Sequence, residues 1–415
     1  MWSGQALSLL GSGLVQFALV WWLTRETGRA TVLATATLVA LLPQILLGPF
    51  VGALVDRWNR RLIMMIADTG IALATGILVL LFAFGWIEVW HVFIILLIRS
   101  LGGAFHGPAM SASTSLMVPK EHLARIAGLN QTLQGLLSVF APPLGALLLE
   151  LLPMQGVLAI DIGTALLAVL PLAFISIPNP PRQEAMSSEG ARQTSYWQDL
   201  KEGFVYVVKW PGLFGIILLA MMLNFLLVPS SSLTPLVITQ IFEKGVLELA
   251  WVETAFGIGV ILGGLALSAW GGFKKRIVTS LTGVIGIGLG VLLIGILPAE
   301  WFVLLLVAYF LMGLAQVFAN GPLIAIFQSS INPDVQGRVF SLISAGATAM
   351  MPLSLMVAGP IADWLGIRAW YLFGGVTCIL FTAFAFFIPA IMNIEQNRSP
   401  ISQVEQSHGP SDESQ

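Results

Sequence analysis

The chain contains twelve continuous apolar runs, each bounded by charged residues or by Gly and Pro clusters. A helix needs about 20 apolar residues to cross the hydrocarbon core of a bilayer, and each run reaches that length. An outer-membrane barrel would instead alternate apolar and polar residues over short segments. Because backbone polar groups in a bilayer must be satisfied within their own segment, the runs predict helices. They lie at residues 2–23, 32–54, 62–84, 91–112, 127–149, 155–177, 212–234, 249–270, 277–297, 302–325, 339–361 and 370–392.

The predicted fold class is therefore an all-α integral membrane protein with twelve transmembrane helices, and the composition agrees. Charged residues make up 10% of the chain, against about 25% in soluble domains. The net charge of −2 gives no indication of nucleic-acid binding. The single cysteine, Cys378, excludes an intrachain disulfide. The four histidines, at positions 91, 106, 122 and 408, are too dispersed to predict a metal site.

The distribution of basic residues predicts the orientation in the membrane. Of the 19 Lys and Arg residues, fourteen lie in segments on the same side as both termini, four lie on the other side, and Arg99 lies within a run. Basic residues accumulate on the cytoplasmic side, so we expect both termini to be cytoplasmic. The first run lacks a basic start and a small-residue cleavage pattern, so we do not expect it to be a signal peptide.

The longest polar stretch between runs, residues 178–211, divides the chain into two sets of six spans. We expect an N-terminal half at 1–177, a cytoplasmic linker at 178–211, a C-terminal half at 212–392 and a disordered polar tail at 393–415. Within the linker, Trp197, Leu200, Phe204 and Val208 recur at helical spacing. This spacing predicts a short amphipathic helix, lying either at the membrane interface or on the end of the bundle.

An internal repeat supports the division into halves. Gly107–Pro108 and Gly321–Pro322 are 214 residues apart, and Pro119 and Pro333 have the same offset. Each segment covers the end of one span, a loop and the start of the next. Transporters are commonly built from such repeats, with the substrate site between the halves.

The loop between the second and third runs contains the most specific motif in the chain. It reads Gly-Ala-Leu-Val-Asp-Arg-Trp-Asn-Arg-Arg. This resembles the signature of the major facilitator superfamily, with Asn59 in place of the usual glycine and the signature positions held by Gly52, Asp56, Arg57, Arg60 and Arg61. The resemblance implies the superfamily fold, two six-helix halves. Because a glycine allows close helix approach and Asp56 can pair or cap a helix, we expect these residues to form a gate.

Arg99 is the only basic residue inside a run. An unpaired charge there is costly, so it marks a functional hypothesis. The spacing of Arg99, Gly103 and Gly107 resembles the superfamily motif of the fourth span, whose arginine is linked to proton coupling. The alternative is a structural arginine bound to backbone carbonyls.

Three carboxylates lie within runs: Asp68, Asp161 and Glu253. Burial favours the protonated form of a carboxyl group, so each is a candidate proton carrier. Asp161 is in the same half as Arg99 and on the same side of the midplane, so we expect these two to pair. Structural pairing near the Arg60–Arg61 loop is the alternative for Asp68, and exposure to solvent is the alternative for Glu253.

The resemblance also implies which spans line the cavity: the first, fourth, seventh and tenth. Here these spans carry aromatic and amide side chains with few charges, which suits a bulky amphipathic ligand. The alternative for each residue is a helix–helix contact. The candidates are Gln5, Gln16, Phe17, Trp21, Phe105, His106, Asn224, Phe225, Gln316, Phe318 and Asn320.

The whole chain resembles the macrolide-efflux subgroup of drug:proton antiporters, most clearly at residues 2–24, 38–61, 199–207 and 248–259. The fifth span keeps Pro142 and Gly145 of the exporter signature but has alanine at 141 and 146, so that signature is degenerate and a proline kink also explains it. The resemblance implies export of macrolide antibiotics across the bacterial inner membrane by alternating access. It also implies that a proton gradient, not a cofactor, drives export.

Further expectations are a monomer in contact with membrane lipids, no nucleic-acid partner and, as in related proteins, functional pairing with an ATP-binding ribosome-protection protein. A lipid, lysophospholipid or siderophore transporter of the same fold is the alternative. We do not expect an enzyme, because metalloprotease, serine-hydrolase and phosphate-cradling motifs are missing from the sequence.

Overall fold

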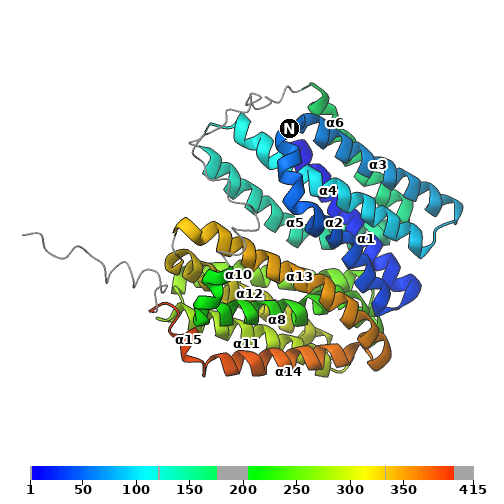
Figure 1. Cartoon of the computed structure of the whole chain (residues 1–415). Helices are drawn as coiled ribbons and strands as arrows, with labels where there is room; N and C mark the ends of the chain where they lie inside the picture. The colour runs from blue at the N-terminus through cyan, green and yellow to red at the C-terminus, as the bar shows by residue number, and fades with distance from the viewer. Residues whose placement is uncertain (1, 120–121, 175–203, 332, 397–415) are drawn as a thin grey trace, which may run out of the picture.

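The computed structural model describes residues 2–119, 122–174, 204–331 and 333–396 (Figure 1). Among these residues, twelve helices are long and apolar enough to cross a membrane, which confirms the predicted fold class. They are α1 (Trp2–Thr27), α2 (Ala30–Arg57), α3 (Arg60–Phe84), α4 (Val89–Met117), α5 (Leu123–Leu151), α6 (Met154–Phe174), α8 (Pro211–Ser232), α10 (Val246–Trp270), α11 (Arg276–Ile296), α12 (Phe302–Ser330), α13 (Pro333–Leu365) and α14 (Ile367–Ala385). Shorter elements are α9 (Thr234–Leu236), a π-helix (Val237–Ile241) and α15 (Pro389–Met392).

Some helices begin or end at other residues than the predicted apolar runs, because no change in hydropathy marks the helix end at those positions. The last span ends at Ala385, not at residue 392, and α15 begins separately at Pro389. Proline has no backbone N–H to continue a helix, but the surrounding residues stay apolar, so the run conceals the break. At the other extreme, α13 begins at Pro333 and α5 at Leu123, several residues before the apolar runs. These helices extend through polar sequence beyond the predicted spans.

The first six helices form one half of the molecule, and α8 to α14 form the other (Figure 1). The closest packing within the C-terminal half is between α10 and α12. A Cβ atom at Gly259 would collide with the Phe310 carbonyl oxygen, and one at Gly313 would collide with the Phe256 carbonyl oxygen. Glycine at both positions therefore lets the two helix backbones touch, a packing mode common in membranes.

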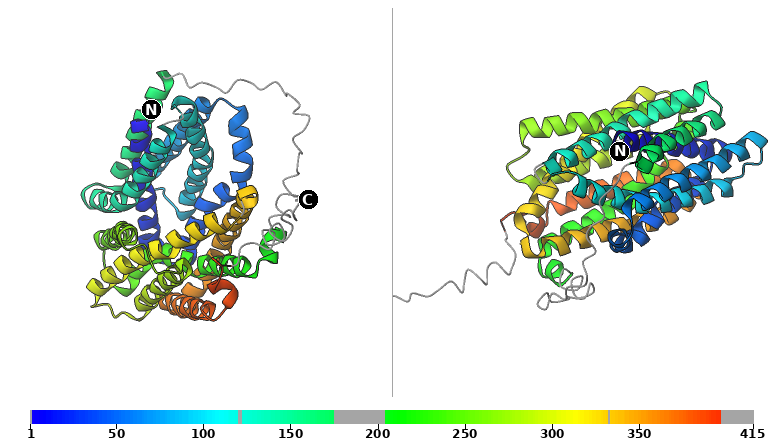
Figure 2. Two further views of the ribbon diagram at one scale, coloured as in Figure 1. Left: turned by 90° about the vertical axis from the view of Figure 1, so that its left-hand side faces the viewer. Right: turned by 90° about the horizontal axis from the view of Figure 1, so that it is seen from above.

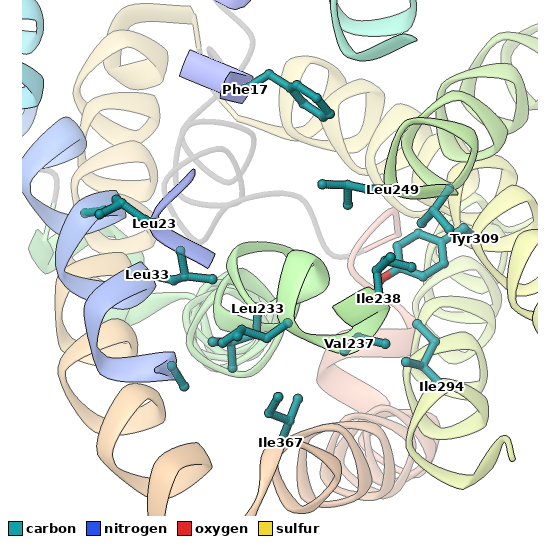
Figure 3. Packing of buried hydrophobic residues seen from close by; sticks show 14 of the residues in the cluster. Phe17, Leu23, Leu33, Leu233, Val237, Ile238, Leu249, Ile294, Tyr309 and Ile367 are labelled. Atoms are coloured by element: carbon teal, nitrogen blue, oxygen red, sulfur yellow. The ribbon is translucent and has the colours of Figure 1, made fainter. Parts of the chain in front are cut away.

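We call the end of the bundle where α1 begins and α15 lies the terminal face, and the other end the opposite face. One hydrophobic core joins the two halves near the opposite face. Figure 3 shows part of it, including Leu23 and Leu33 from the N-terminal half with Leu233 and Ile367 from the C-terminal half.

Near the terminal face, each half instead has its own core. That of the N-terminal half includes Val51 and Met64, and that of the C-terminal half includes Trp210 and Leu281. Figure 2 (left) looks onto this face, with the N-terminal half above the C-terminal half. Among the described residues, the hydrophobic core that the halves share therefore lies at the opposite face.

Polar contacts reinforce the junction at the opposite face. The Asp363 carboxylate at the end of α13 accepts hydrogen bonds from the backbone N–H groups of Ala30 (2.6 Å) and Thr31 (3.0 Å) and from the Thr31 hydroxyl (2.5 Å). It thereby caps the N-terminus of α2, which belongs to the other half. The side-chain amide of Gln240 donates to the Gly28 carbonyl oxygen (2.5 Å) beside this cap.

Most of the predicted linker, and the tail after residue 396, lie outside the described residues. Residues 204–209 form a short helix. It packs on the bundle through Tyr206, Val207 and Trp210, which are buried. Phe204 and Val208, from the predicted apolar face, are exposed. The described part of the linker thus contacts the end of the bundle while presenting apolar side chains outward.

Candidate functional site

A cavity of about 740 Å³ lies in the C-terminal half. Its walls are formed by α8, α10, α11 and α12, and α5 contributes Gly135, Ser138 and Val139 from the other half. Most lining side chains are aliphatic. This size and lining are typical of sites that take a drug-sized ligand.

Three amide side chains interrupt the apolar wall: Asn224, Gln316 and Asn320. The Nδ2 group of Asn224 donates to the Ala220 carbonyl oxygen (2.9 Å), and that of Asn320 donates to the Gln316 carbonyl oxygen (3.1 Å). Each asparagine therefore satisfies a donor within its own helix and keeps its carbonyl oxygen as an acceptor. These three residues were cavity candidates in the sequence.

Glu253 also lines the cavity, from the third turn of α10. Since α10 begins at Val246, the residue lies deeper than the predicted span start at 249 suggested. Its side chain is partly buried. Among the described residues, Glu253 has no hydrogen bond and no ion pair, so its carboxylate is available to a ligand.

The other eight cavity candidates do not line this cavity. Gln5 and His106 belong to a polar cluster described below, and the remaining six are packed elsewhere. They lie against neighbouring helices or the shared core. Phe17 packs on α5 against Gly145, Trp21 packs against the shared core and Gln16 is partly buried on α1. Phe105 stacks on Trp58 with ring centroids 6.5 Å apart. Phe225 packs against Trp370 (6.4 Å), and Phe318 packs against Trp270 (6.0 Å).

The N-terminal half contains a buried ion pair. The Arg99 guanidinium on α4 lies 2.6 Å from the Asp161 carboxylate on α6, as the sequence analysis expected. Arg99 also donates to the Thr75 hydroxyl (2.7 Å) and to the Ser12 carbonyl oxygen (3.4 Å). Thr75 and Ser12 in turn donate to the two Asp161 oxygens, at 3.1 and 3.3 Å. This network joins α1, α3, α4 and α6 around a pair of compensating charges.

A second polar cluster lies closer to the terminal face. His106 Nε2 is 2.8 Å from Gln5 Oε1 and 3.3 Å from Asp68 Oδ1. The Gln5 amide donates to Asp68 Oδ2 (3.1 Å). Among the described side chains, Asp68 therefore pairs with Gln5 and His106. Sequence reasoning placed Gln5 and His106 among cavity residues and did not connect them with Asp68.

The signature loop is described in part. Asn59 caps α3 by accepting a hydrogen bond from the Leu62 N–H (3.2 Å), which explains an asparagine at a position where glycine is usual. Arg60 is buried and donates to the Ala112 carbonyl oxygen on α4 (3.0 Å). Arg61 is partly buried. The side chains of Asp56 and Arg57 lie outside the described set.

The expected close approach at Gly52 is not made in this conformation. The residue is exposed, and a Cβ atom there would meet nothing within 4 Å. This end of α2 lies near the terminal face, where the described residues of the two halves form separate cores.

Two six-helix halves, a drug-sized cavity in one of them and an ion pair buried inside the membrane-spanning helices of the other form the architecture of a membrane transporter. The chain belongs to the Major Facilitator Superfamily, whose family model matches residues 1–242 and 228–408. This confirms the family that the signature loop indicated.

The similar proteins with recorded names include efflux proteins. Macrolide efflux protein A of Streptococcus pyogenes is 34% identical over 380 residues, which cover 91% of this chain and 92% of that protein. Macrolide efflux protein A of Enterococcus faecalis is 33% identical, over 79% of this chain and 100% of that protein. Multidrug efflux pump Tap of Mycolicibacterium fortuitum is 25% identical, over 94% and 95%.

Solved structures share the fold at low sequence identity. A bacterial homologue of the human lysosomal transporter Spinster, in an inward-facing and occupied conformation, has a TM-score of 0.70 and 14% identity, with 96% of this chain and 98% of that chain covered. The nucleoside transporter NupG has a TM-score of 0.67 and 15% identity, with 93% and 98% covered.

Proposed function

We propose that the protein exports macrolide-type antibiotics across a bacterial inner membrane by alternating access, with inward proton flow as the energy source. The observation that carries this proposal is the cavity of about 740 Å³, whose apolar wall holds three amides and one carboxylate without a partner among the described residues. The names of the relatives at 33–34% identity support macrolides as the substrate class.

Glu253 is the residue that we assign to substrate binding. Macrolides with 14- or 15-membered rings carry a basic amino sugar on a large apolar ring, so they need a carboxylate within an apolar pocket. Their ammonium group and a proton would compete for the Glu253 carboxylate. Competition of this kind allows the carboxylate to release the drug when it takes up a proton, which is the requirement for exchange in opposite directions.

We assign coupling in the N-terminal half to Arg99 and Asp161. A guanidinium does not release a proton at physiological pH, so the proton would bind to Asp161 and free Arg99 from it. Breaking this pair would change the contacts that join α1, α3, α4 and α6. The proposed orientation, with both termini cytoplasmic, makes the present conformation inward-facing, because its shared core lies at the opposite face.

Drug susceptibility tests the proposal. Expression in a susceptible strain should raise the inhibitory concentration of 14- and 15-membered macrolides, and a protonophore should remove the protection. Expression of Glu253→Ala at the same membrane level is the matched control and should protect poorly. An unchanged inhibitory concentration across macrolides at confirmed expression would overturn the substrate assignment. Accumulation of a lipid, lysophospholipid or siderophore in a deletion strain would then favour the alternative.

We also propose that the monomer exports drug without a cofactor, and that any ATP-binding ribosome-protection protein adds to resistance separately. The same strain lacking that protein tests this point. Efflux of labelled macrolide should persist there, while total resistance falls.

A further inference from the structure

The two polar clusters of the N-terminal half are related by a constant spacing. On α1 the cluster residues are Gln5 and Ser12, on α3 they are Asp68 and Thr75, and on α4 they are His106 and Arg99. Each pair is seven residues apart, or two helical turns, which is about 10 Å along a helix. The three helices therefore form two polar layers, with the His106 layer nearer the terminal face.

The layers differ in the kind of charge that faces the carboxylate. Arg99 carries a permanent charge opposite Asp161. In the other layer the same position on α4 holds His106, whose charge can change, opposite Asp68. Histidine is the side chain that titrates without perturbation between about pH 5 and 8.

The hydrogen bonds define where a proton would bind. The Gln5 amide N–H donates to Asp68 Oδ2, so its Oε1 atom is the acceptor that faces His106 Nε2. With Asp68 ionised, both oxygen atoms that face Nε2 are acceptors, so Nε2 carries the hydrogen atom in this state. An additional proton therefore binds at His106 Nδ1, or on the Asp68 carboxylate itself.

Because the pair is buried, losing that proton costs free energy. Gln5, Asp68 and His106 are 0%, 5% and 7% exposed. With one bound proton, the pair is either a carboxylate with an imidazolium or two neutral groups, and its net charge is zero. Without it, one uncompensated negative charge remains inside the bundle, a costly state.

From this arrangement we propose that His106 and Asp68 form a second proton-binding site that holds one proton as a pair. The site lies two turns from Arg99 and Asp161, on the side of the terminal face. This proposal rests on the proposed proton-driven export. In that process the site would take up a proton from the terminal face or release one toward it.

Among the described residues, no other charged side chain forms a hydrogen bond or ion pair with His106 or Asp68. On α3, the charged group that faces His106 is Asp68. On α1, the group that faces His106 is the neutral amide of Gln5. From α2, the amide of Gln44 lies 3.7 Å from the Cβ position of Gly103, about one turn away. Between the layers, Ile71 packs against Gly102 and separates His106 from Arg99. Among the described side chains, Asp68 is therefore the ionisable partner of His106.

Titration of the purified protein tests proton binding without transport. The chain has four histidines, so ¹⁵N-histidine NMR gives few resonances. The His106 signals are those that disappear in His106→Gln, and His122→Gln, which alters an exposed residue, is the matched control. In Asp68→Asn, the pH dependence of the His106 resonances should differ from that of the wild-type protein, because the carboxylate that shares the proton is gone. Absence of titration, together with unchanged proton uptake in the Asp68→Asn/His106→Gln double variant, would overturn the proposal.

Transport in proteoliposomes tests the role in coupling. For His106→Gln, macrolide-driven proton flux should fall by about tenfold, the change in rate that corresponds to about 1.4 kcal/mol in a barrier. Exchange of labelled macrolide at equal pH needs no net proton movement across the membrane, so its rate should stay near that of the wild-type protein. An equal fall in both rates would mean that the cluster is structural. If the wild-type protein moves no protons with macrolide, proton-driven export fails, while the titration still decides whether the pair binds a proton.

Discussion

Removing the Asp363 carboxylate should weaken the closed junction at the opposite face. Asp363 makes three hydrogen bonds of 2.5 to 3.0 Å to Ala30 and Thr31, and so caps a helix of the other half. An N-cap contributes about 0.5–2 kcal/mol, and a negative charge at a helix N-terminus adds about 0.3–1 kcal/mol when exposed. Because Asp363 is exposed to solvent, we take about 1–2 kcal/mol for the total.

This energy predicts the change in conformational population. Since 1.4 kcal/mol is a factor of ten, Asp363→Ala should raise the ratio of open to closed at this face by about five- to 30-fold. Asp363→Asn should give a smaller change, because one amide oxygen still accepts. The cap is made only when the halves are together, so its full energy acts on the equilibrium between the two states.

Distances between spin labels on the two halves measure this ratio. Glu150 and Glu300 are exposed on different halves near the opposite face. The buried Cys378 is replaced by alanine to leave only the labelled sites. Double electron–electron resonance should then show a larger population of long distances in Asp363→Ala. Glu248→Gln is the matched control, because Glu248 caps its own helix within the C-terminal half. An unchanged distance distribution in Asp363→Ala would refute the reasoning.

Three further predictions concern the proposed machinery. Arg99→Ala and Asp161→Asn should each lower the free energy of unfolding by about 3–5 kcal/mol, because each removes one partner of a buried ion pair; thermal unfolding in detergent measures this loss. Arg99→Ala should also lose uphill efflux. Normal uphill pumping by this variant would make Arg99 a packing residue. Glu253→Gln should weaken efflux of a basic macrolide by about tenfold, the effect of losing about 1.4 kcal/mol, with little change for a macrolide lacking the amine; equal effects on both would contradict substrate recognition by charge. Asp56→Asn should cut efflux at an unchanged protein level in the membrane, and normal efflux would show that the signature loop only determines topology.

The helices and the Arg99–Asp161 contact could be predicted because each follows from the cost of placing a group in lipid. Apolar length alone identifies a span. A lone arginine inside a span needs a partner, and Asp161 was the carboxylate in the same half at a similar depth. The roles of these residues in coupling remain predictions.

The position of the cavity could not be predicted in the same way. Its walls are mostly aliphatic, and an aliphatic residue facing a cavity has the same sequence signal as one facing lipid. Phe225 and Phe318 lie on the expected helices but pack against Trp370 and Trp270. Which side of a wholly apolar helix faces the interior depends on packing between helices, since its hydropathy is nearly uniform around its circumference.

The His106–Asp68 contact was missed for a different reason. The seven-residue spacing on α1, α3 and α4 is present in the sequence, but it becomes a pattern only when the helices are aligned in depth. The cap by Asp363 likewise joins residues that are far apart along the chain. Asp363 is separated from Ala30 by 333 positions and from Thr31 by 332 positions. Contacts of this separation leave no local signal in a single sequence.

The two halves differ in how their polar groups are satisfied, and this difference bears on the proposed division of roles. In the N-terminal half, Asp68 and Asp161 each have polar partners on other helices, so a change in protonation must alter contacts between helices. In the C-terminal half, Glu253 and the carbonyl oxygens of Asn224 and Asn320 keep unused bonding capacity in the cavity. Groups with unused capacity can bind a ligand without breaking existing contacts, whereas fully paired groups can report a proton only by breaking them. This supports drug binding mainly in the C-terminal half and proton-linked rearrangement mainly in the N-terminal half, joined through the contact that Asp363 makes with α2.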